Sequence, residues 1–72
     1  QGLYAQRKRS LDEELRTMQD GLAMAMQEKR MNDNLFKSGD VSELDVLRAK
    51  RQVTEIEGRI AATKNKYLQM LR

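Results

Sequence analysis

Two heptad repeats, separated by a single turn signal, constrain the fold of this chain more than any other feature. In the second half, seam positions separated by alternating steps of three and four residues are Val46, Ala49, Val53, Ile56, Ile60, Thr63, Tyr67 and Met70. In the first half, the corresponding positions are Leu11, Leu15, Met18, Leu22 and Ala25. Such spacing places one apolar stripe along each helix and is typical of coiled coils.

The two repeats share one register. If the chain folds back about Gly39, facing residues have numbers that sum to about 78, and Leu22 then faces Ile56. In the same way, Met18 faces Ile60 and Ala25 faces Val53, so the apolar positions of one half meet those of the other. Upstream, the frame of the first half continues through Tyr4 and Lys8, and towards the turn it continues through the polar residues Lys29 and Asn32 to Phe36. The agreement predicts an antiparallel hairpin of two helices.

The reversal is predicted at Lys37-Ser38-Gly39-Asp40. Gly39 tolerates the positive φ that ends many helices. Ser42 followed by Asp45 has the spacing of a capping box, which starts a helix. We therefore predict an all-α fold, an antiparallel two-helix coiled-coil hairpin with helices at about 3–36 and 42–71 and a turn at 37–41.

The composition excludes several kinds of function. The chain has 72 residues and no Cys or His, so disulfides and Cys or His catalysis are impossible and a structural zinc site is improbable. A chain of this length forms at most one domain and is marginally stable alone. We expect no cofactor and no enzyme activity, because a two-helix rod offers no pocket for shifting carboxylate pKa values. We expect residues 1–72 to be one hairpin from a larger protein.

Large apolar residues also lie outside the predicted seam, and five that we single out are in the half of the hairpin near the turn. They are Met24, Met31, Leu35, Leu44 and Leu47. In one interpretation the seam shifts near the turn, since Met31 and Leu47 also sum to 78. In the other, the residues form an exposed patch at the tip that docks on another protein, a use to which flexible Met side chains are suited.

The sequence around the turn resembles a known family. Residues 35–48 read Leu-Phe-Lys-Ser-Gly-Asp-Val-Ser-Glu-Leu-Asp-Val-Leu-Arg, and the likeness extends over about residues 30–60. This stretch resembles the hairpin tip of periplasmic adaptors (membrane fusion proteins) of type I secretion and tripartite efflux systems, and is closest to the HlyD type.

The resemblance implies a set of contact residues. In the family, an Arg, a Leu four residues later and a Ser seven residues beyond the Leu contact the partner. Leu35 and Ser42 have the required spacing, whereas the Arg position holds Met31 and the nearest arginine is Arg30. The predicted contact surface also includes the turn residues, which are Gly39, Asp40 and Val41.

The resemblance also implies a function and a place. The tip is expected to dock on a TolC-type outer-membrane duct, and the parent chain to link it to an inner-membrane transporter. Such adaptors form homo-oligomeric rings, generally of six hairpins. The implied location is the periplasm, with an inner-membrane anchor outside residues 1–72.

Two other functions stay open. One is a structural coiled-coil spacer, whose tip would tolerate substitution. The other is a basic arm that binds RNA through Arg48, Lys50, Arg51, Arg59, Lys64 and Lys66. The net charge of +3 arises in the second half, but its signs are interleaved, which is typical of a solvated helix surface. We therefore expect no nucleic-acid partner.

Overall fold

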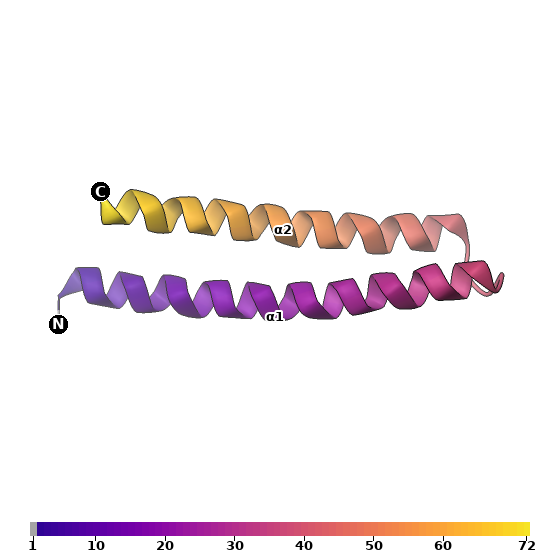
Figure 1. The fold of residues 1–72 in the computed structure, drawn as a ribbon. Helices are drawn as coiled ribbons and strands as arrows, with labels where there is room; N and C mark the ends of the chain where they lie inside the picture. The colour runs from indigo at the N-terminus through magenta and orange to yellow at the C-terminus, as the bar shows by residue number, and fades with distance from the viewer. Residues whose placement is uncertain (1) are drawn as a thin grey trace.

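The computed structural model describes residues 2–72 as two antiparallel helices (Figure 1). Helix α1 spans Leu3–Lys37 and helix α2 spans Glu43–Leu71. The hairpin is a rod that measures 55 × 16 × 10 Å. The predicted all-α hairpin is confirmed, and the predicted helix bounds differ by one residue at the end of α1 and the start of α2. Neither described helix is long and apolar enough to cross a membrane.

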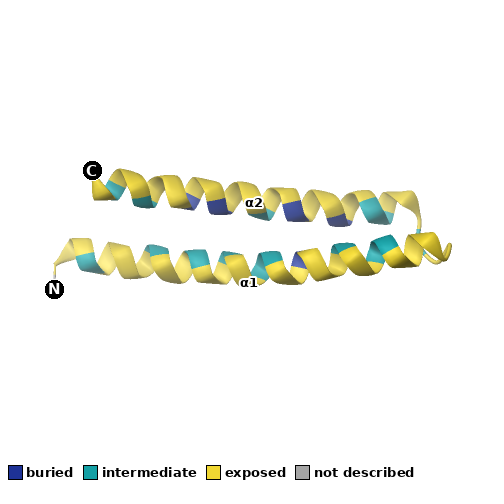
Figure 2. Cartoon of the chain, in the orientation of Figure 1, coloured by how far each residue is buried: buried dark blue, intermediate teal, exposed yellow. Residues whose placement is uncertain are grey.

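The core is a single seam between the helices (Figure 2). Its buried residues are Ala25, Ala49, Val53, Ile60 and Thr63. Seam positions that are half-buried are Leu11, Leu15, Met18, Leu22, Lys29, Asn32, Val46, Ile56, Tyr67 and Met70. Every predicted seam position of α2 is therefore at least half-buried. In α1, the outermost positions of the frame, Tyr4, Lys8 and Phe36, are exposed.

Two contacts between the helices fix the register. The Thr63 hydroxyl donates to the Met18 sulfur over 3.6 Å, and the Lys8 ammonium lies 6.0 Å from the centre of the Tyr67 ring. The residue numbers of these pairs sum to 81 and 75, on either side of the predicted 78. Tyr67 and Asp12 beside the Lys8 ammonium raise the pKa of Lys8 above its usual value. The contacts confirm the predicted register.

Of the two interpretations of the off-seam residues, the shift of the seam near the turn does not hold. Met31 is 56% exposed and Leu47 is 50% exposed, so these residues do not replace the polar seam positions. Lys29 stays half-buried and its ammonium reaches the Asp33 carboxylate over 3.0 Å. The Asn32 amide donates to the Glu28 carbonyl over 2.9 Å. Each polar residue thus has a hydrogen-bond partner within α1 and stays at the seam.

Candidate docking site at the hairpin tip

The turn is closed by a Schellman motif. Gly39 has a φ of +80°, the left-handed conformation that glycine adopts at little cost. The Gly39 N–H donates to the Phe36 carbonyl over 3.0 Å, and the Asp40 N–H donates to the Leu35 carbonyl over 2.8 Å. These bonds satisfy carbonyls that the end of a helix would otherwise leave unpaired. They also hold the backbone of Leu35 and Phe36 against the turn.

A capping box starts α2 directly after the turn. The Ser42 hydroxyl accepts from the Asp45 N–H over 3.3 Å, and the Asp45 carboxylate accepts from the Ser42 N–H over 3.0 Å. The Ser42 hydroxyl also donates to this carboxylate over 3.0 Å. The Ser42 backbone N–H and hydroxyl hold the pKa of Asp45 below its usual range. Ser42 is thus the N-cap of α2, and its hydroxyl proton is already used within the tip.

Three large apolar side chains surround this turn without being covered. Leu35 is 39% exposed, Phe36 is 46% exposed and Leu44 is 53% exposed. Leu35 and Leu44 are exposed because they lie outside the seam, and Phe36 is exposed because it faces Ser42, which precedes α2. The three side chains, together with the turn 38–42, make up the apolar tip.

Phe36 belongs to the apolar tip, although its heptad position predicts a place in the seam. The register of the hairpin already predicts that Phe36 is exposed. In a hairpin with facing numbers that sum to 78, Phe36 faces Ser42, which precedes α2 and has no apolar side chain. A seam position that faces a cap residue is exposed, so Phe36 belongs to the candidate docking site.

The other predicted contact residues lie around the apolar tip in different directions. Met31 precedes Leu35 by four residues, which places both side chains on one face of α1. Arg30 is rotated by about 100° from that face. Gly39 and Asp40 are exposed at the turn, whereas Val41 is half-buried. The structure therefore brings Leu35, Met31 and the turn to one end of the molecule, and sets Arg30 to one side.

The basic residues of α2 do not form one face. Lys66 lines a shallow groove on one side of the hairpin, and Lys64 lines a groove on the opposite side. Because a polyanion-binding surface normally gathers its cations on one face, this arrangement does not favour an RNA-binding arm. Among residues 2–72, no group of acidic side chains could hold a metal ion.

Comparison with known proteins adds no relative, because no family model, no curated protein and no solved structure matches the chain. The fold and the site alone define it as an α-helical hairpin whose closed end is apolar and whose turn is held by backbone hydrogen bonds.

Proposed function

We propose that the hairpin is the docking arm of a periplasmic adaptor and that its apolar tip binds a TolC-type outer-membrane duct. The rest of the parent chain would link it to an inner-membrane transporter for secretion or efflux. The observation that carries this proposal is the exposure of Leu35, Phe36 and Leu44 around a turn with a defined conformation. The resemblance of residues 30–60 to HlyD-type tips supports the choice of partner.

The proposed mechanism is binding without catalysis. Leu35 and Phe36 would enter an apolar groove between helices of the duct, while the exposed Asp40 stays at its polar rim. Since the Schellman motif and the capping box already order the turn, little conformational entropy is lost when the tip docks. Ser42 would accept a hydrogen bond from the duct, because its own proton is donated to Asp45.

The expected affinity of one tip is low. Burying a whole Leu or Phe side chain gains about 1.5–3 kcal/mol, and the three tip side chains are already about half-covered. Most of this gain offsets the cost of association. Tight attachment to the duct would therefore need several hairpins acting together, through their effective concentration.

Direct binding tests the tip assignment. The purified duct protein in detergent is immobilised, and the 72-residue chain is titrated over it. Leu35→Ser and Phe36→Ser should each weaken binding about tenfold. The matched control is Leu68→Ser, which changes a leucine that is more exposed than Leu35 and lies far from the turn, and it should leave binding unchanged. Equal binding by the tip variants and the control would show that the tip is not the docking surface, as a simple spacer would require.

Ser42 offers a second test that separates capping from contact. Asp and Asn are both good N-caps. Ser42→Asp adds a negative charge to the tip, whereas Ser42→Asn leaves it neutral. The Asp variant should weaken duct binding and reduce export by the parent adaptor, with helix content nearly unchanged, while the Asn variant should stay close to wild type. Normal export by the Asp variant would contradict a contact at Ser42.

A further inference from the structure

Two grooves lie beside the seam near the open end of the hairpin, and their charges differ. One of them, which we name the Arg7 groove, is lined by Gln6, Arg7, Ser10, Leu11, Lys66 and Met70. The opposite groove is lined by Asp12, Leu15, Lys64, Tyr67 and Leu68, so its cation is accompanied by a carboxylate. Among residues 2–72, no acidic side chain lines the Arg7 groove. The Arg7 groove is therefore cationic, whereas the charges of the opposite groove balance.

The two cations of the Arg7 groove have no carboxylate beside them on their own helices. Ion pairs along a helix form between residues three or four positions apart. The residues at these distances from either cation are all uncharged: Leu3, Tyr4, Ser10, Leu11, Ala62, Thr63, Gln69 and Met70. The salt bridges among residues 2–72 instead join Lys8 to Asp12 and Lys29 to Asp33. Both charges of the groove can therefore pair with an external anion.

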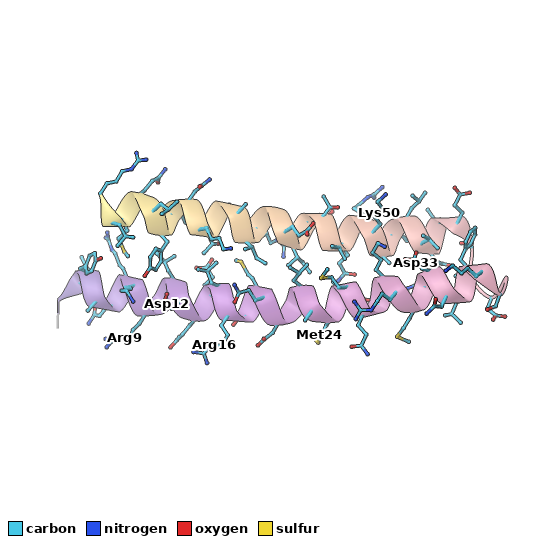
Figure 3. All side chains as sticks on the ribbon, viewed as in Figure 1. Arg9, Asp12, Arg16, Met24, Asp33 and Lys50 are labelled. Carbon is cyan, nitrogen blue, oxygen red and sulfur yellow. The ribbon has the colours of Figure 1, made fainter. Side chains whose placement is uncertain are left out.

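Neighbouring cations do not extend the Arg7 groove into a basic surface. The side chains of Arg9 and Arg16 point away from α2 (Figure 3). Lys64 lines the opposite groove. The groove thus holds two positive charges, whereas a surface for a polyanion gathers many cations on one face. Its charge fits a small anionic ligand.

The Arg7 groove also has an apolar part and room for a small molecule. Leu11 and Met70 are half-buried seam residues that line it. The groove has a volume of about 400 Å³, compared with about 240 Å³ for the opposite groove. Sites that bind small molecules typically have volumes of about 300–1,000 Å³. Cations beside apolar side chains complement a molecule that joins an anionic head to an alkyl chain.

We propose that the Arg7 groove binds a single-chain anionic amphiphile of the fatty-acid class. The carboxylate of the ligand accepts hydrogen bonds from the Arg7 guanidinium, whose planar fork matches two carboxylate oxygens. The Lys66 ammonium supplies the second charge, and the Ser10 hydroxyl is a further donor. The alkyl chain lies on Leu11 and Met70, where the stems of the two cationic side chains also cover it.

The inference goes beyond duct binding, because the Arg7 groove lies at the end of the hairpin opposite to the apolar tip. The groove is open to solvent, so the ligand buries only part of its chain and binding should be weak and reversible. Since all four polar residues that line the groove are exposed, no rearrangement of the seam is needed for the ligand to enter.

A ligand series tests the proposed chemistry. The isotope-labelled 72-residue chain is titrated with decanoate below its micelle concentration, and backbone amide shifts are followed by NMR. Saturable shifts are expected at residues 6–11 and 66–70, with the turn unchanged. Acetate has the head without the chain and decanol has the chain without the charge, so each should bind at least about tenfold more weakly. Binding of either as tight as that of decanoate, or shifts confined to the apolar tip, would overturn the proposal.

Charge removal tests the site with a control of equal net charge. The double variant Arg7→Gln, Lys66→Gln changes two exposed side chains, so it should fold, and it should weaken decanoate binding about tenfold. The control is Arg9→Gln, Lys64→Gln, which removes the same charge outside the Arg7 groove and should bind decanoate like the wild type. Equal losses in the two double variants would show that only net charge matters and would contradict the site. Neither experiment contains a duct, so its failure would leave docking at the tip unaffected.

Discussion

Single residues around the turn decide where this chain reverses. Gly39 supplies the one positive φ among residues 2–72, and Ser42 with Asp45 closes the first turn of α2. Both features were predictable, because Gly at a helix end and the Ser-x-x-Asp spacing have direct conformational causes. The exposure of Met31 and Leu47 was not predictable from composition alone. Lys29 and Asn32 stay at the seam and each has a hydrogen-bond partner inside α1, which a pattern of apolar residues does not reveal.

Gly39→Ala should destabilise the hairpin, whereas Gly58→Ala should stabilise it. An L-residue in the left-handed conformation of Gly39 costs roughly 1–2 kcal/mol. Gly58 lies inside α2 with no atom within 4 Å of an added Cβ, so Ala gains up to about 1 kcal/mol of helix propensity there. Urea unfolding followed by circular dichroism measures both changes. Shifts of the same sign in the two variants would contradict the role of Gly39.

Asp45 should make the hairpin sensitive to acid. The pKa of Asp45 in the folded chain is held below its ordinary value of 3.8 by the Ser42 N–H and hydroxyl. Its contribution to stability is therefore present above pH 3.8 and is lost as the pH falls through the lower, folded value. Thermal melting between pH 6 and pH 2 should show a larger fall in Tm for the wild type than for Asp45→Asn.

The control for the acid experiment is Glu57→Gln, which removes an exposed carboxylate that makes no capping bond. It should keep the pH dependence of the wild type. If Asp45→Asn and Glu57→Gln flatten the profile equally, the capping box does not cause the sensitivity to acid.

Each helix is stabilised by one stripe of seam residues, which packs against the stripe of the other helix. All eight predicted seam positions of α2 are buried or half-buried, so the heptad predicted its inner face completely. In α1 the same frame failed at its ends, where Tyr4 and Phe36 are exposed. The reason is physical: a heptad defines a face of a helix, but burial also needs a facing helix at that height. Near the turn no such helix is present, and the candidate site arises there.

Ile60→Ala should remove most of the stability that the seam provides. Ile60 is 8% exposed, and truncating a buried Ile to Ala typically costs about 2–5 kcal/mol. The matched control is Leu68→Ala in the same helix, where the side chain is 56% exposed and the change should stay within about 0.5 kcal/mol. Urea unfolding compares the two variants, and equal losses would contradict a core confined to the seam.

For the whole molecule, the register of α1 against α2 decides which side chains lie together at the tip. It places Leu35, Phe36 and Leu44 at one end of the rod. Contacts at the seam hold the register, because both salt bridges among residues 2–72 join residues within α1 and therefore do not link the two helices. A slip of one heptad would keep the stripes in contact but would move α2 by about 10 Å along α1.

Distances between nitroxide labels measure this register directly. The chain has no Cys, so labels attach only at introduced positions, and Asp20, Gln27, Arg51 and Gly58 are exposed sites on the outer faces of the two helices. Pulsed electron–electron double resonance on double Cys variants should give similar label-to-label distances for the pairs 27/51 and 20/58, because the two sites of each pair lie at the same height along the rod. The crossed pairs 27/58 and 20/51 should both be longer, and by similar amounts, because each is offset by about 10 Å along the rod. If one crossed pair gave the shortest distance, the helices would be displaced by a heptad, and the residues of the apolar tip would no longer lie together at one end of the hairpin.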